Sequence, residues 1–288
     1  MTTVVIRAHY GSDETLRMAQ WLSDGGYRVV FAADFAAGRF DTGPHDVVEI
    51  SVAKAEKLGL FTNLRRPLWQ CGDYVLYLAA EEGITDDILL TEGDVRFSTD
   101  RAPDHFFASL PDAGDCFLVD FVQANAHWPW HTACHGFGMT VFRCRFPLVF
   151  AKLPVIQAAY RLRREQSAAM PDAMLIDNTL WPNDEAFFAS AAVASGFTVR
   201  DFNSIKRMYD SYTFKFDPPF LEEAFVETKD KDDKIYHPVL SFEHYMAKLV
   251  RNPAFRQDRT KVQAEIDRLL ARGFPREKIE RVLRLPPP

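Results

Sequence analysis

The hydrophobic pattern of the N-terminal part alternates between short apolar runs and a longer stretch with helical periodicity. Val4–Ala8 and Tyr27–Ala33 are apolar and rich in β-branched residues, which is typical of buried strands. Between them, Asp13–Asp24 carries apolar residues at helical spacing and is followed by Gly25-Gly26, a helix breaker. The pattern predicts a strand, a helix and a second, parallel strand: a βαβ unit.

The same alternation continues to about residue 165. Further strands are predicted at Val47–Ile50, Ile88–Leu90, Cys116–Phe121 and Met139–Cys144, and helices at about Trp69–Glu81 and Leu153–Glu165. Strands and helices that alternate in this way predict an α/β fold with a mostly parallel, doubly wound sheet flanked by helices.

From about Phe242 the pattern becomes purely helical. Lys261–Arg272 has a one-sided apolar face, Gly273 ends this helix, and Pro275 begins another. We therefore predict a domain at 1–241 and a C-terminal helical appendage at 242–288. The last three residues, all proline, are predicted to be unstructured.

The composition is typical of a globular protein. A hydrophobic share of 47% allows a sizeable core. Four cysteines at irregular spacing fit a reducing compartment. We identify neither a signal peptide nor an apolar run near the roughly 20 residues of a membrane span, so a soluble, cytoplasmic protein is expected.

The net charge of −6 is unevenly distributed. Residues 244–288 hold eleven Lys/Arg and five Asp/Glu, a net of +6, so the other residues carry −12. Such a basic segment would suit contact with an anionic surface, although an ordinary solvated helix face explains it as well. No nucleic-acid partner is expected.

The main candidate for chemistry is Ile88–Val95, an apolar strand that ends in Glu92-Gly93-Asp94. In an open parallel sheet, ligands bind at the carboxyl ends of strands. In extended chain, Glu92 and Asp94 point to the same side, and Gly93 allows a close approach. Two carboxylates there suit Mn²⁺ or Mg²⁺ with phosphate oxygens. An acidic turn without a metal is the alternative.

About one helix before this strand lies Trp69–Tyr77, which includes Cys71-Gly72-Asp73. With this element order, residues 3 to 240 resemble GT-A-type glycosyltransferases, which bind a metal through a D-x-D motif at the end of a central strand. The chain has Glu92 where the family usually has Asp, so the resemblance supports Asp94 as a metal ligand more firmly than Glu92.

The resemblance also implies a nucleotide-sugar half at about 1–100 and an acceptor half at about 101–241. His9 and Tyr10, after the first strand, and Asp34, after the second, would line the nucleoside pocket. The segment Cys71, Gly72 and Asp73, at the start of the following helix, would help to hold the nucleotide, together with Glu92.

Trp181-Pro182-Asn183 leads into a helix that begins with Asp184 and Glu185 and stops at Gly196. By resemblance to inverting enzymes, one of these carboxylates is the general base for the acceptor hydroxyl. First-turn acids also simply complement the helix dipole, which would lower their pKa. Trp181 would stack on a sugar or belong to the core.

His237, in the predicted strand Lys234–Val239, is the third candidate metal ligand. In the family such a histidine completes the metal site, whereas a lone histidine otherwise serves packing or the surface. His127, His131, Cys134 and His135 offer a competing zinc site, but their spacing matches no zinc signature. We interpret this stretch as an aromatic acceptor loop.

Together these features predict a metal-dependent glycosyltransferase of the hexosyltransferase class. It would move a sugar from a UDP- or GDP-sugar to a hydroxyl of a glycan or lipid-linked acceptor, in bacterial polysaccharide biosynthesis. Peripheral contact with the inner membrane face would involve 244–288. One alternative is a catalytically silent GT-A-like binding protein. Another is a sugar nucleotidyltransferase, which would need a Gly-rich loop where Ala8–Asp13 has a single glycine.

Overall fold

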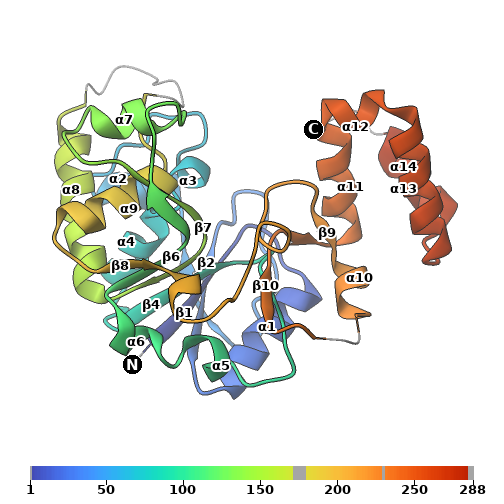
Figure 1. Ribbon diagram of the computed structural model, residues 1–288, viewed down its shortest axis with the longest axis horizontal. Helices are drawn as coiled ribbons and strands as arrows, with labels where there is room; N and C mark the ends of the chain where they lie inside the picture. The colour runs from blue at the N-terminus through green and yellow to red at the C-terminus, as the bar shows by residue number, and fades with distance from the viewer. Residues whose placement is uncertain (1, 171–179, 229–230, 285–288) are drawn as a thin grey trace. The chain divides into compact units, whose positions relative to one another are not determined.

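The computed structural model of the protein describes residues 2–170, 180–228 and 231–284. Its contacts divide the chain into two compact units, which are described separately (Figure 1). The first unit comprises Met1–Gly93 and Asp100–Met208, and the second comprises Asp94–Thr99 and Tyr209–Pro288. This division falls inside the predicted 1–241 domain. The boundary expected at 241/242 from the change to a helical pattern stays a prediction.

A seven-stranded sheet forms the centre of the first unit, in the order β3-β2-β1-β4-β7-β6-β8. The strands are β1 Thr2–Ala8, β2 Arg28–Ala33, β3 Asp46–Glu49, β4 Asp87–Glu92, β6 Cys116–Gln123, β7 Phe142–Ala151 and β8 Val199–Asp201. All neighbours run parallel except β7, which is antiparallel to β4 and β6. The predicted α/β class with a mostly parallel sheet is therefore confirmed.

Helices cover this sheet. They are α1 Asp13–Asp24, α2 Val52–Lys57, α3 Pro67–Gln70, α4 Tyr74–Glu81, α5 Asp104–Phe107, α6 Leu110–Ala113, α7 His131–His135, α8 Leu153–Ala168 and α9 Asp184–Ala194, with a short 3-10 turn at Phe202–Ser204. Successive strand residues point to opposite faces. One face, with Val5 and Leu90, therefore packs against α4, α8 and α9 in a continuous core (Figure 1).

Three predicted elements differ from the structure. The strand expected at Lys234–Val239 is divided into β10 Lys234–Tyr236 and β11 Val239–Leu240, with His237 between them. The helix expected at Trp69–Glu81 is interrupted at Cys71–Asp73, which separates α3 from α4. The strand expected at Met139–Cys144 begins at Phe142 and runs on to Ala151. The ends of these elements depend on contacts with distant segments, such as the Gly72–Asp184 hydrogen bond after α3 and the pairing of Ala151 with Ile88 at the end of β7.

The second unit combines two small sheets with a run of helices. β5 Arg96–Ser98 pairs antiparallel with β10 Lys234–Tyr236, and β9 Phe220–Leu221 pairs parallel with β11 Val239–Leu240. The helices are α10 Glu222–Val226, α11 Phe242–Arg251, α12 Pro253–Gln257, α13 Arg259–Ala271 and α14 Arg276–Arg284. The described part of the tail is helical, as predicted, and Gly273 adopts φ +86° after α13. The three terminal prolines lie outside the described residues.

The helices of the tail pack on one another through an apolar cluster that includes Phe242, Met246, Leu269 and Ile279. The predicted apolar face of α13 is thereby occupied within the second unit. Among the described residues, no helix has both the length and the apolar character needed to cross a membrane.

Candidate functional site

The carboxyl ends of β1, β2 and β4 lie along one edge of the large sheet, because these strands are parallel neighbours. His9 and Tyr10 directly follow β1 and stack edge to face, with ring centroids 4.8 Å apart. Asp34 directly follows β2, and its carboxylate accepts a hydrogen bond from the Ala36 backbone N–H at 2.9 Å. These residues thus occupy the expected edge, and their role toward a nucleoside stays a prediction.

Glu92 is the last residue of β4 and pairs in register with Arg7 of β1. Side chains that are opposite each other on neighbouring strands lie on the same face. The Arg7 Nη1 accordingly lies 2.8 Å from the Glu92 Oε1. The Arg7 Nη2 donates a second hydrogen bond to the Leu68 carbonyl, at 2.7 Å. Arg7 was not singled out by sequence, although it is the one charged residue in an apolar strand.

Asp184 and Glu185 form the first turn of α9, whose N-cap is Asn183. The Asn183 side chain accepts a hydrogen bond from the Ala186 N–H, which satisfies one of the open donors of the helix start. Asp184 is buried, and its Oδ2 accepts a hydrogen bond from the Gly72 N–H at 3.0 Å. The structure therefore brings together two segments that are 112 residues apart and that sequence analysis had singled out separately.

Gly72 lies in close contact with the side chains of both Arg7 and Asp184. A Cβ atom at this position would lie 2.4 Å from the Arg7 Nη1 and 2.4 Å from the Asp184 Oδ2. Neither distance is compatible with a side chain, so glycine lets the guanidinium and the carboxylate approach the backbone here.

Burial raises the pKa values of Asp184 and Glu185, whereas the helix N-terminus is expected to lower them. Desolvation, together with the neighbouring Glu185 charge, raises the pKa of Asp184 well above its ordinary value, although the Arg7 charge opposes the shift. Desolvation also raises the pKa of Glu185 to about 7, against the opposing effects of Asn183 and Arg145. The expectation of lowered pKa values is therefore wrong, because loss of hydration outweighs the helix dipole.

Cys71 and Asp73 are fully buried. Burial raises the pKa of the Cys71 thiol to about 12. The Asp73 carboxylate forms a two-pronged ion pair with Arg163, with Oδ2–Nε and Oδ1–Nη2 distances of 3.0 and 3.2 Å. These positions favour a structural role for both side chains over the predicted contact with a nucleotide.

The aromatic and histidine candidates around α9 and α7 also have structural surroundings. Trp181 belongs to the core, with its ring 4.9 Å from that of Phe61, which excludes the sugar-stacking alternative. His131 and His135 stack at 5.5 Å on α7, and Cys134 is buried with a raised thiol pKa. Within the described ranges, no three ligands of the competing zinc site come together.

Asp120 and Arg145 are two further charged residues that the sequence analysis missed. Asp120 has φ +56° at an irregularity of the β6–β7 pairing, a conformation that is uncommon for a residue other than glycine. Its Oδ2 lies 3.3 Å from the Arg145 Nε. Both charges act on the pKa of Glu185, in opposite directions. In the sequence, the acidic residue Asp120 inside the otherwise apolar run Cys116–Phe121 could have indicated a functional position here.

In the second unit, Asp94 and His237 lie close together. The His237 Nε2 is 3.7 Å from the Asp94 Oδ1, and the imidazole is buried and stacked on Phe214. The His237 Nδ1 lies 3.1 Å from the Lys215 carbonyl oxygen. Because a carbonyl only accepts, Nδ1 carries a proton, so that in the neutral imidazole Nε2 presents its lone pair. This is the usual way in which a metal-binding histidine is oriented.

The donor set of Glu92, Asp94 and His237 offers two carboxylates and one imidazole, which fits Mn²⁺ and is acceptable to Mg²⁺. Gly93 alone separates Glu92 from Asp94 in the chain. Glu92 belongs to the first unit, whereas Asp94 and His237 belong to the second.

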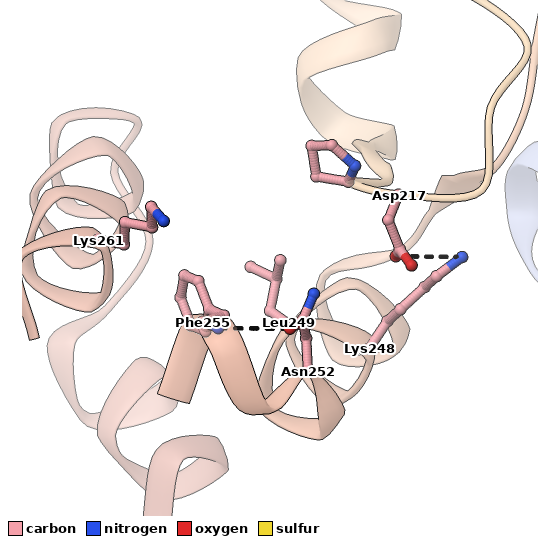
Figure 2. A pocket seen from close by; sticks show the side chains of 7 residues that line it. Asp217, Lys248, Leu249, Asn252, Phe255 and Lys261 are labelled. Carbon is pink, nitrogen blue, oxygen red and sulfur yellow. Dashed lines mark hydrogen bonds and ion pairs between the residues drawn. The ribbon is translucent and has the colours of Figure 1, made fainter. Parts of the chain in front are cut away.

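The second unit also contains a cavity of about 250 Å³, shown in Figure 2, which is lined by Asp217, Pro218, Lys248, Leu249, Asn252, Phe255 and Lys261. None of the predicted site residues belongs to this lining. The Lys248 Nζ lies 3.8 Å from the Asp217 Oδ1, and the Lys261 Nζ lies 3.2 Å from an Asp258 oxygen. Both lysines of the cavity lining thus have an acidic partner, and we assign no ligand to the cavity.

Comparison with known proteins gave matches among solved structures alone. No family model and no curated protein matches the chain. The galactosyltransferase LgtC, in complex with donor and acceptor sugar analogues, is 12% identical with a TM-score of 0.42, and the match covers 98% of this chain and 95% of LgtC. A second LgtC structure, that of an active-site mutant, is 13% identical with a TM-score of 0.42, and the match covers 82% of this chain and 86% of the mutant.

A glycosyltransferase involved in glycosylation of the major capsid of PBCV-1 is 14% identical, with a TM-score of 0.37 and coverage of 82% of this chain and 91% of that protein. These neighbours are glycosyltransferases. With TM-scores below 0.5, none of the similarities assigns a role to a residue of this chain.

Proposed function

We propose that the chain is a metal-dependent glycosyltransferase that moves a sugar from a nucleoside-diphosphate sugar to a hydroxyl acceptor. The observation that carries the proposal is the convergence of Glu92, Arg7, Gly72 and Asp184 at the carboxyl edge of the large sheet. In parallel α/β sheets this edge is where ligands bind. Glu185, beside Asp184, has a pKa of about 7, which suits proton transfer near neutral pH.

We assign cation binding to Asp94 and His237, with Glu92 as a further ligand. The buried imidazole, oriented by the Lys215 carbonyl, supports this role for His237. Bound Mn²⁺ or Mg²⁺ would offset the negative charge on the leaving diphosphate. His9, Tyr10 and Asp34 would contact the nucleoside, whereas the Gly72 N–H already has Asp184 as its acceptor.

Glu185 is our candidate for the general base, and Asp184 holds the start of α9 in place. As the acceptor oxygen forms its bond to the anomeric carbon, the bond from that carbon to the diphosphate breaks. The proton of the acceptor hydroxyl passes to the Glu185 carboxylate, and the nucleoside diphosphate leaves with the bonding electrons. The buried Asp184, tied to the Gly72 N–H, is less accessible to an acceptor than the half-buried Glu185.

The proposed acceptor is a glycan or a lipid-linked sugar, with the reaction taking place in the cytoplasm and residues 244–288 in contact with the inner membrane face. The packing of this segment favours a scaffold over a membrane surface. Its apolar residues contact one another, and at least six of its basic side chains lie within 4 Å of an acid. The membrane contact stays a prediction, tested below.

The function is tested by thermal shift with UDP, GDP, CMP and dTDP, each with Mn²⁺ and with EDTA. A ligand at a hundred times its Kd stabilises the folded state by about 2.7 kcal/mol, so one nucleotide should raise Tm in the presence of Mn²⁺. The matching nucleotide-sugars are then assayed for hydrolysis and transfer. Metal-dependent stabilisation without turnover would identify a binding protein instead. Neither stabilisation nor turnover with any nucleotide would refute the proposal.

A further inference from the structure

Arg7 is the only charged residue of β1, whose other central positions form the core of the first unit. Its side chain is 14% exposed. A largely buried guanidinium is costly unless its charge and donors are satisfied. Arg7 meets this requirement with the Glu92 carboxylate on one nitrogen and the Leu68 carbonyl on the other.

The same guanidinium lies against a third segment. Gly72 leaves space for the Arg7 Nη1 and the Asp184 Oδ2, both of which a Cβ atom at this position would meet at 2.4 Å. The Asp184 Oδ2 in turn accepts the Gly72 N–H. Arg7 thus contacts the end of β4 through Glu92 and α3 through the Leu68 carbonyl, and it lies beside Gly72, whose N–H holds the start of α9 through Asp184.

We propose that Arg7 is a positioning residue that fixes the Glu92 carboxylate and the Asp184-Glu185 turn relative to one another. The role in turnover rests on the proposed function, whereas the clamp itself rests on the contacts alone. Glutamate at position 92, rather than a shorter aspartate, belongs to the same arrangement, because its extra methylene group carries the carboxylate to 2.8 Å from Arg7.

A lysine cannot replace this geometry. The planar guanidinium presents two nitrogens at a fixed angle, to Glu92 and to the Leu68 carbonyl, whereas an ammonium is a single point charge. Arg7→Lys therefore keeps the charge and loses the simultaneous contacts, which separates positioning from simple electrostatics.

The test is hydrogen–deuterium exchange on the full chain, with Arg7→Met, Arg7→Lys and the control Arg28→Met. Arg28 also forms a salt bridge to a neighbouring strand, with Asp46 at 2.9 Å, but at an exposed site. With Arg7→Met, exchange at Gly72 and in the first turn of α9 should become faster by at least about tenfold, the scale of one lost charged hydrogen bond. Arg7→Lys should show the same local effect, and Arg28→Met should leave both segments unchanged.

A second readout is the split between kcat and KM for the nucleotide-sugar found to turn over. Misplacement of the Asp184-Glu185 turn should lower kcat by about a hundredfold with little change in KM. If the wild-type chain has no turnover, the proposed function fails while the exchange result still decides the clamp.

Unchanged exchange at Gly72 and α9 in both Arg7 variants overturns the inference. Exchange that increases equally in all segments, including α1, also overturns it, because Arg7 would then be a general stability residue. Should Arg7→Met not fold, Arg7→Lys carries the test, since its aliphatic stem fills the same space.

Discussion

The buried ion pair between Asp73 and Arg163 gives the sharpest prediction about stability. Both side chains are completely buried. Asp73 also accepts a hydrogen bond from the Tyr77 hydroxyl at 3.0 Å, and Arg163 donates to the Pro182 carbonyl at 3.0 Å. Burial opposes the Arg163 charge, but the Asp73 carboxylate outweighs it and raises the pKa of the guanidinium. The Arg163 guanidinium therefore stays charged.

Asp73→Leu would leave the Arg163 charge buried without its counter-ion. Breaking such a pair from one side costs about 3–5 kcal/mol, a large part of the roughly 5–15 kcal/mol that is typical of folded proteins. The double substitution Asp73→Leu with Arg163→Met removes both charges, so it should cost less than the single one. The exposed Lys54–Glu82 pair, with a 2.6 Å contact, is the control. There, Glu82→Gln should change stability by less than about 1 kcal/mol.

The assay is urea unfolding followed by far-ultraviolet circular dichroism, with the free energy of unfolding compared among these variants and the wild type. A loss below about 1 kcal/mol for Asp73→Leu would contradict the reasoning. A double variant less stable than the single one would show that the loss comes from packing rather than from the uncompensated charge.

Four further predictions concern the site and the tail. Asp94→Ala should abolish Mn²⁺-dependent nucleotide binding in calorimetry while Tm is retained, and undiminished binding would remove the metal assignment. Glu185→Gln should lower turnover by at least about a hundredfold with donor binding intact. In the wild type, turnover should rise with pH through about 7, since the base acts when ionised, and a rate that is flat below pH 7 would exclude Glu185. Gly72→Ala should cost about 1–3 kcal/mol in urea unfolding, because its Cβ would meet two atoms at 2.4 Å. The control is Gly136→Ala, where φ is −57° and a Cβ would make only ordinary contacts at 3.5 and 3.7 Å. If residues 244–288 contact the membrane, the full chain should sediment with anionic liposomes at low salt and not at high salt, since each basic residue near the surface contributes about 1 kcal/mol. Equal binding to neutral vesicles, or none to either, would leave the tail as the scaffold that its packing favours.

Glu185 also links stability to pH. Its pKa is raised in the folded state, from the ordinary 4.5 to about 7, so the folded state holds this proton more tightly than the unfolded state does. The corresponding stability is fully present below about pH 4.5 and is lost as the pH rises through about 7. Glu185→Gln should remove this component.

Much of the large sheet could be predicted because its strands are almost continuously apolar. Burial on both faces leaves runs such as Val4–Ala8 that local pattern alone identifies. The helix ends near Gly26 and Gly273 could also be predicted from local sequence. Both glycines adopt a positive φ, a conformation that glycine favours and that commonly follows the last turn of a helix.

The candidate site could be predicted only in part, because its contacts depend on register between distant strands. Nothing near Arg7 in the sequence indicates that Glu92 lies opposite, and nothing near Gly72 indicates that Asp184 fills the space beside it. The predicted direction of the Glu185 pKa shift was wrong for a related reason. The helix dipole is a local effect that sequence reveals, whereas desolvation depends on what the whole fold packs around the carboxyl group.

The pairing of β5 with β10 has a consequence for how the chain is synthesised. The two strands belong to the same unit, yet Thr99 and Asp233, joined by a 2.7 Å side-chain hydrogen bond, are 134 residues apart. At about 5–20 residues per second, a ribosome needs roughly 7–27 s to cover that distance. Throughout this interval β5 stays without its partner strand while residues 100–208 of the first unit are synthesised. A nascent chain stalled near residue 208 would therefore expose an edge that the finished protein covers.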